Sequence, residues 1–310
     1  MRFWNKALVV VVAVAGLALA AGAAFASSND DKKETHMTQQ APSTLVKSGY
    51  AQVNGLSMYY EVHGQGQPLV LLHGAFGTID GMFSSMIPAF AKDRQVIAFE
   101  MQGHGHTADI DRPLRYETMA DDVYAALQQL GVKQADFLGY SMGGGISLQM
   151  AIRHPETVRK LVIVSAPAAR NGWYPEIRAA FDGMSSAMAP MFMTTPIYDA
   201  YKAVAPNPDA FPALLDRVGD STRIDYDWTK EVAAIRAPAL IVAGDTDGVQ
   251  LEHVVQMFAS LGGTKVDHAQ FGKPASQLLI IPGADHIGVM MEHAGEITDA
   301  ASKFLALPVQ

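Results

Sequence analysis

A serine between glycines, in the sequence Gly139-Tyr140-Ser141-Met142-Gly143, is the strongest chemical signal in this chain. It directly follows the apolar pair Phe137-Leu138 and precedes a segment with apolar residues at helical spacing. A strand, a sharp turn and a helix in this order lift a serine hydroxyl clear of the backbone. The glycines permit the turn, and the helix N-terminus favours negative charge developing on a substrate. We therefore interpret Ser141 as a candidate nucleophile.

A serine hydroxyl is a poor nucleophile unless a base, itself oriented by a carboxylate, removes its proton. His286 is the histidine best placed for this task, because it follows the apolar strand candidate 278–281. It should therefore emerge at the carboxyl end of the sheet, where ligands bind in open α/β folds. His268 lies in an irregular stretch and stays a less favoured alternative.

The carboxylate that orients the base is expected in the loop after the apolar segment 240–242, which contains Asp245 and Asp247. Either aspartate could orient His286. We favour Asp247, because the loop has more reach at that position. The corresponding loop after residues 161–164 begins Ser165-Ala166-Pro167-Ala168 and offers no carboxylate.

Hydrolysis of a carbonyl compound also needs fixed N–H donors for the oxyanion that forms. The residue after the nucleophile, Met142, offers one such donor. The loop His73-Gly74-Ala75-Phe76-Gly77 is expected to offer another, from Ala75 or, less favoured, from Phe76. The sequence therefore predicts an oxyanion hole made by Ala75 and Met142.

Short apolar runs alternate with segments of helical periodicity along most of the chain. Asn54-Gly55, between two segments of alternating character, predicts a β-hairpin. Further strands are expected at 68–72, 95–99, 135–138, 160–164, 239–242 and 277–281, and helices at 116–130, 142–154, 251–261 and 292–305. This alternation is typical of an α/β fold with a mostly parallel central sheet flanked by helices.

Residues 168–232 interrupt the alternation, because they are rich in methionine, proline and aromatic residues and contain no strand pattern. We expect an inserted helical cap, since a structureless loop of that length is improbable in a compact domain. Thioether and aromatic side chains suit an adaptable apolar substrate pocket, although they could equally pack the cap onto the core. The expected pocket residues are Phe76 from the core and Met184, Met188, Met191 and Phe192 from the cap.

The N-terminus has the features of a secretory signal peptide: Arg2 and Lys6, a long apolar run, and the small-residue site Ala24-Phe25-Ala26. We expect a signal peptide over 1–26, a polar linker over 27–47, and a core formed by 48–167 and 233–310. Because of this signal peptide, we expect the protein to be exported to the periplasm or the medium, without stable membrane association after cleavage. An uncleaved membrane anchor is the alternative, because the apolar run is close to spanning length.

The composition narrows the function classes. A net charge of −8 argues against electrostatic binding of nucleic acid. The chain contains no cysteine, which excludes disulfides, cysteine nucleophiles and thiolate metal sites. No cluster of histidines and carboxylates has metal-ligand spacing. We therefore expect no metal and no cofactor, and the sequence leaves the oligomeric state open.

The motifs together resemble the α/β-hydrolase superfamily, in its capped esterase and lactonase branch. The resemblance is carried by His73-Gly74, Gly103-His104-Gly105, Gly139-Tyr140-Ser141-Met142-Gly143-Gly144, Gly244-Asp245-Thr246-Asp247 and Pro282-Gly283-Ala284-Asp285-His286. The chain order serine, acid, histidine is that of the superfamily. The resemblance implies the α/β-hydrolase fold and implies that Asp247 is the triad acid. One departure is Glu100, which stands where relatives usually carry aspartate.

The resulting hypothesis is hydrolysis of a small, apolar carboxylic ester or lactone through an acyl-enzyme on Ser141, with His286 as base and Asp247 as its partner. A carbon–carbon bond hydrolase or a cofactor-free haloperoxidase-like enzyme could use the same three residues. A non-catalytic ligand-binding protein with this fold is the third possibility. Motifs of this kind indicate the family much more strongly than the substrate.

Overall fold

The computed structural model describes residues 44–263 and 276–308. The expected signal peptide over 1–26, nearly all of the expected linker and His268 lie outside the described residues. The first described strand begins at Leu45, inside the segment that we expected to be linker, so the core starts earlier than residue 48.

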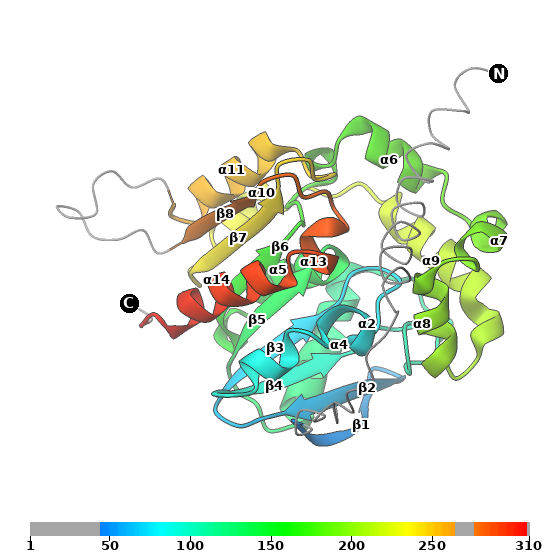
Figure 1. Cartoon of the computed structure of the whole chain (residues 1–310), viewed down its shortest axis with the longest axis horizontal. Helices are drawn as coiled ribbons and strands as arrows, with labels where there is room; N and C mark the ends of the chain where they lie inside the picture. Colours follow the sequence, from blue (N-terminus) through cyan, green and yellow to red (C-terminus); the bar gives the residue numbers. More distant parts are fainter. Residues whose placement is uncertain (1–43, 264–275, 309–310) are drawn as a thin grey trace, which may run out of the picture.

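One eight-stranded sheet organises the described chain (Figure 1), in the order β1-β2-β4-β3-β5-β6-β7-β8. Strand β2 pairs antiparallel with β1 and β4, and the remaining pairs are parallel. The strands are β1 Leu45–Val53, β2 Leu56–His63, β3 Gln67–Leu72, β4 Arg94–Phe99, β5 Ala135–Tyr140, β6 Val158–Val164, β7 Ala239–Gly244 and β8 Gln277–Ile281. The predicted fold class, a mostly parallel sheet with a leading hairpin, is confirmed.

The hairpin turn has the backbone that its sequence favours. Asn54 has φ 48° and Gly55 has φ 84°, which is the left-handed pair required by a type I′ turn. Asparagine and glycine adopt this conformation more readily than other residues, so Asn54-Gly55 fixes the register of β1 on β2.

Helices cover both faces of the sheet (Figure 1). The sheet divides the core into two apolar clusters, one on each face. Val70 and Leu72 of β3 belong to one cluster, whereas Leu69 and Leu71 belong to the other, because successive strand residues point to opposite faces. The first face is covered by α4 Tyr116–Gln129, α5 Met142–Arg153 and α11 Leu251–Ser260. The second is covered by α2 Ile79–Phe83, α3 Ile87–Phe90, α13 Gly288–Met291 and α14 Ala294–Ala306.

The chain between β6 and β7 is helical apart from its connections, as the sequence predicted. Its elements are η2 Arg170–Gly172, α6 Pro175–Asp182, η3 Ser186–Met188, α7 Ala189–Phe192, α8 Pro196–Val204, η4 Pro208–Ala210, α9 Phe211–Thr222 and α10 Thr229–Ala233. Helices α6 to α9 gather at one side of the sheet (Figure 1). Helix α10 instead packs on α5 and α11, so the last residues of the expected cap, from Thr229, lie with the core. Over residues 44–263 and 276–308, no helix is long and apolar enough to cross a membrane.

Candidate active site

Ser141 occupies a strained turn between β5 and α5. Its φ is 52° and its ψ is −113°, a conformation that residues with a Cβ rarely adopt. The Ser141 N–H donates to the Val164 carbonyl at 2.8 Å, which ties the turn to the neighbouring strand. A Cβ on Gly143 would lie 2.0 Å from the carbonyl oxygen of Leu72, so only glycine permits this approach of helix and strand. This local geometry is that of a nucleophile elbow.

Three predicted side chains, from three distant parts of the sequence, form one hydrogen-bonded line. His286 Nε2 lies 3.0 Å from Ser141 Oγ. His286 Nδ1 lies 2.9 Å from Asp247 Oδ1. With Nδ1–H donating to the carboxylate, Nε2 carries a lone pair that accepts the Ser141 hydroxyl proton. The arrangement can therefore activate the hydroxyl for attack on a carbonyl carbon.

The structure decides between the two candidate acids in favour of Asp247 as the partner of His286. Asp245 Oδ1 instead accepts the backbone N–H of Gly283 at 2.7 Å. The two loops approach closely, since a Cβ on Gly244 would lie 1.9 Å from the Ala284 carbonyl oxygen. Asp245 thus joins the backbones of the loops, and Asp247 reaches the imidazole.

Asp247 is buried, with 5% of its surface exposed, and yet its surroundings favour the ionised form. Burial works to raise the pKa of Asp247, but the charge and hydrogen bond of His286, the Ser165 hydroxyl and the Val249 N–H together lower it. Ser165 Oγ lies 2.5 Å from Asp247 Oδ2, and the Val249 N–H lies 3.1 Å from Oδ1. A carboxylate with this many donors remains charged near neutral pH.

Two aromatic residues hold the imidazole of His286. The Tyr140 ring stacks on it with centroids 5.4 Å apart, and the Tyr140 hydroxyl donates to the His286 carbonyl at 2.7 Å. Burial, with smaller effects of Asp247 and Asp285, raises the pKa of Tyr140, so the hydroxyl stays neutral and can donate. The Trp173 ring meets the imidazole edge-on at 5.2 Å. These two roles were not predicted from the sequence, although Tyr140 stands beside Ser141 in the motif.

The loop after β3 passes beside the serine. A Cβ on Gly74 would lie 3.3 Å from the Ser141 Cβ, so this loop runs directly past the nucleophile. Among the residues that the structure describes, no acceptor takes the N–H of Ala75, Phe76 or Met142. Unpaired N–H groups at this point are available to a developing oxyanion. The assignment of Ala75 and Met142 as the oxyanion hole stays a prediction.

Two buried histidines lie side by side, His73 in this loop and His104 in the loop after β4, with ring centroids 5.0 Å apart. His73 Nε2 accepts the N–H of Met101 at 3.1 Å, and His73 Nδ1 donates to the Gly74 carbonyl at 2.7 Å. His104 Nδ1 donates to the Gln102 carbonyl at 2.9 Å. Burial lowers the pKa of both His73 and His104 to about 4, so both are neutral at pH 7. Within 44–263 and 276–308, no group of three or more histidine or carboxylate side chains could hold a metal ion.

Glu100, the departure from the family pattern, is a buried anchor for the loop over residues 103–106. Its carboxylate accepts the N–H of Ile79 at 3.0 Å, and the N–H and Nδ1 of His106 at 2.6 and 2.9 Å. A Cβ on Gly105 would lie 2.2 Å from the Glu100 carboxyl carbon, so the glycine makes room for the longer side chain. These hydrogen bonds of the Glu100 carboxylate are therefore confined to neighbouring backbone and to His106.

The predicted pocket residues fall into two groups. The Phe76 and Phe192 rings lie 5.5 Å apart, and the Phe211 ring joins them at 6.1 Å from Phe76. This aromatic cluster connects the cap to the loop after β3. Met184, Met188 and Met191 are half-buried and pack against the same apolar core. Their contact with a substrate stays a prediction.

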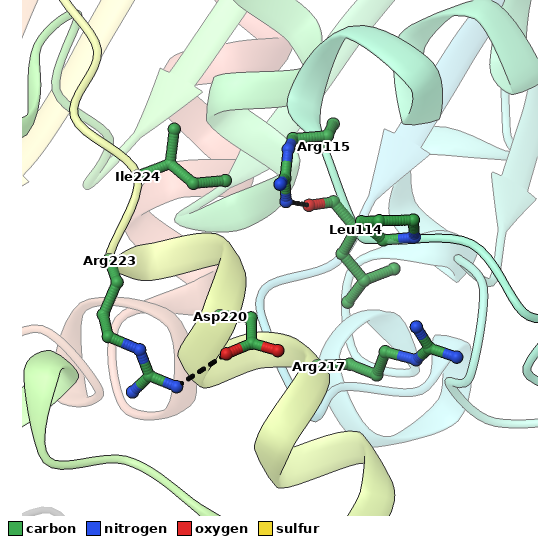
Figure 2. A pocket seen from close by; sticks show the side chains of 7 residues that line it. Leu114, Arg115, Arg217, Asp220, Arg223 and Ile224 are labelled. Atoms are coloured by element: carbon green, nitrogen blue, oxygen red, sulfur yellow. Dashed lines mark hydrogen bonds and ion pairs between the residues drawn. The ribbon is translucent and has the colours of Figure 1, made fainter.

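Two hollows between cap and core lie away from the serine. One, of about 360 Å³, is lined by Pro113, Leu114, Arg115, Arg217, Asp220, Arg223 and Ile224. Figure 2 shows its charged side chains, of which Arg223 pairs with Asp220 at 2.8 Å. The other, of about 350 Å³, is lined mainly by residues 103–109 and 201–214. Ser141 lines neither hollow, so neither marks the candidate site.

The chain belongs to the alpha/beta hydrolase fold family, whose model matches residues 67–292. A protein of Azorhizobium caulinodans that carries the provisional name carbamate hydrolase RutD is 30% identical over 227 residues, 68% of this chain and 84% of that protein. The 2-hydroxymuconate semialdehyde hydrolase of a Pseudomonas species is 38% identical over 106 residues, 33% of this chain and 38% of that protein. The crystal structure of the Burkholderia xenovorans enol-lactonase matches with a TM-score of 0.62 at 22% identity, covering 83% of this chain and 100% of that one. The predicted family and fold are confirmed, and the chain is a hydrolase-family protein.

Proposed function

We propose that this protein hydrolyses small carboxylic esters or lactones through an acyl-enzyme formed on Ser141. The observation that carries the proposal is the unbroken line from Ser141 Oγ through His286 to Asp247, with contacts of 3.0 and 2.9 Å. Each member has the residue type and the place in the line that acyl transfer needs. The line forms at the carboxyl ends of parallel strands, where open α/β folds bind their ligands.

In the first step, Ser141 Oγ attacks the carbonyl carbon while His286 Nε2 takes the hydroxyl proton. Asp247 stabilises the imidazolium that forms. The carbonyl oxygen becomes an oxyanion and accepts the N–H groups of Ala75 and Met142. The carbon–oxygen bond to the leaving group then breaks, and His286 returns the proton to the departing alkoxide. The product of this half-reaction is an ester on Ser141.

In the second step, water attacks the acyl-enzyme. His286 removes one proton from the water, and the oxyanion forms again between the same donors. Collapse breaks the bond to Ser141 Oγ, and His286 gives the proton back to the serine. The acid product leaves and the enzyme returns to its starting state. None of these steps requires a redox change or a metal ion.

Two observations support the proposed substrate class. Phe76 in the loop after β3 and Phe192 in the cap form an apolar contact, which suits an uncharged acyl or alkyl group nearby. The family relatives named above include a lactonase, whose substrate is a cyclic ester. Both observations support small, uncharged esters and lactones.

The direct test is turnover of a panel of p-nitrophenyl esters and simple lactones by the parent protein and by Ser141→Ala. We expect turnover by the parent and loss of at least about 10³-fold in the variant. Ser57→Ala is the matched control, because Ser57 is an exposed serine in β2. An inactive parent would contradict the proposal and favour a ligand-binding protein with this fold.

Carbon–carbon bond hydrolysis is the second candidate, favoured by the relative that is a 2-hydroxymuconate semialdehyde hydrolase. A vinylogous diketone substrate added to the same panel separates the two reactions. Faster turnover of that substrate than of every ester and lactone would make this second activity the principal one. A haloperoxidase-like activity on the same three residues is measured by adding halide, peroxide and acetate.

A further inference from the structure

Ser165, which directly follows β6, repeats the backbone geometry of Ser141 one strand away. Its φ is 53°, against 52° for Ser141. The Ser165 N–H donates to the Val242 carbonyl at 2.8 Å, just as the Ser141 N–H donates to the Val164 carbonyl at 2.8 Å. Three adjacent parallel strands, β5, β6 and β7, are thus joined at their carboxyl ends by two serines with nearly the same positive φ. One of the two, Ser141, is the candidate nucleophile.

The side chain of Ser165 points at the buried acid. Its surface is 1% exposed, and its hydroxyl lies 2.5 Å from Asp247 Oδ2. The other carboxylate oxygen, Oδ1, already receives His286 Nδ1 and the Val249 N–H. Ser165 is therefore the donor for Oδ2 among the described residues, and it fixes the rotation of the carboxylate about its own axis.

The strained backbone of Ser165 indicates a specific requirement for this hydroxyl. Positive φ is unfavourable for any residue with a Cβ, and glycine would relieve the strain. Strain of this kind persists only where the surroundings determine the conformation, and it is concentrated at functional sites. Here the compensating contact is a charge-assisted hydrogen bond to a buried carboxylate, which is among the stronger kinds.

We propose that Ser165 is a positioning residue that holds Asp247 so that Oδ1 faces the imidazole of His286. This inference rests on the proposed hydrolase chemistry for its effect on turnover. Without the hydroxyl, Oδ2 is a buried carboxylate oxygen with no donor, which is costly. The carboxylate then rotates to share its remaining donors, and the Nδ1–H of His286 loses its fixed acceptor. The imidazole becomes a less well-oriented base.

The test compares Ser165→Ala with Ser165→Gly. Both remove the hydroxyl, but only the glycine also relieves the positive φ, so it remains a folded comparison if the alanine variant is unstable. We expect kcat to fall about tenfold in both variants, with KM within about twofold of the parent, because hydrogen bonds to charged groups have effects of this size. The glycine variant should unfold at a higher temperature than the alanine variant.

Ser221→Ala is the matched control, since Ser221 is a buried serine whose hydroxyl donates to the Val218 carbonyl within α9. It should leave kcat unchanged. Values of kcat within twofold of the parent in both Ser165 variants would overturn the inference. So would a rise in KM at unchanged kcat, which would indicate a packing effect on the site.

A second readout does not need turnover. Proton NMR follows the Nδ1–H of His286, identified by its absence in His286→Gln, and measures its exchange with water. We expect slow exchange in the parent and fast exchange in both Ser165 variants. Unchanged exchange in both variants would overturn the positioning role. If the parent proves inactive while exchange still responds to Ser165, the proposed function fails and the positioning role stands.

Discussion

The Nδ1 atom of His286 lies 2.9 Å from Oδ1 of Asp247, whereas the neighbouring carboxylate of Asp245 holds the backbone N–H of Gly283 at 2.7 Å. Two aspartates of one short loop thus have separate tasks. One reaches the imidazole and fixes its tautomer, and the other joins the loop after β7 to the loop after β8. This separation makes the two aspartates a natural pair of variants.

Asp247→Asn should lower kcat by roughly 10³- to 10⁴-fold, because an amide cannot stabilise the imidazolium and favours the wrong tautomer. Asp245→Asn is the matched control, since the amide oxygen can still accept the Gly283 N–H. We expect it to change kcat less than about threefold. Steady-state kinetics on the best ester of the panel measures both. Equal losses in the two variants would contradict the assignment of the acid.

Stability should fall steeply between about pH 6.5 and pH 4 because of His73 and His104. Burial lowers the pKa of both side chains to about 4 in the folded protein, whereas unfolded histidine titrates near 6.5. Below about pH 6.5 the unfolded chain therefore binds protons that the folded chain excludes. The stability is fully present above this window and decreases as the pH falls through it, by at most about 1.4 kcal/mol per pH unit for each histidine.

Urea unfolding at several pH values measures this slope for the parent and for His104→Asn. The asparagine keeps an N–H for the Gln102 carbonyl but does not titrate, so the slope should decrease. The same slope in both proteins would show that His104 does not cause the acid sensitivity. Loss of the Asp247 carboxylate interactions adds a further decrease only below about pH 4, because the pKa of Asp247 is lowered.

Gly143→Ala should destabilise the fold by at least about 2 kcal/mol, because the new Cβ would overlap the Leu72 carbonyl oxygen and force the strand and helix apart. Gly295→Ala is the opposite case, since a Cβ there meets nothing within 4 Å in helix α14. It should stabilise by about 0.5–1 kcal/mol. Chemical denaturation measures both. A neutral Gly143→Ala would contradict the close approach at the elbow.

The parts of the fold that repeat a simple pattern could be predicted from the sequence. Strand β8 has the predicted bounds, Gln277–Ile281, because its last four residues form a continuous apolar run, which is typical of a parallel strand. Helices α2, α3 and α13 were not predicted, since five, four and four residues are too few to show helical periodicity. They form because the sheet offers an apolar face on which to pack.

In the candidate site, too, some residues could be predicted from the sequence and others could not. Ser141, His286 and Asp247 stand in motifs at strand ends, so their meeting could be expected from the parallel sheet. Ser165 was passed over because it is not a carboxylate, and its proposed role depends on Asp247, which follows the neighbouring strand β7. Local sequence does not contain that information. The contact of the Trp173 ring with His286 could not be predicted either, because the two residues are far apart in the sequence.

The most direct test of the central claim is covalent labelling with a fluorophosphonate, followed by mass spectrometry of the intact and digested protein. An activated serine displaces fluoride and becomes a phosphonate ester, whereas ordinary serines do not react. We predict one adduct per chain, on the peptide that contains Ser141, absent from Ser141→Ala and strongly slowed in His286→Gln. Labelling of another residue, or ester turnover by the parent with no labelling of Ser141, would contradict the account.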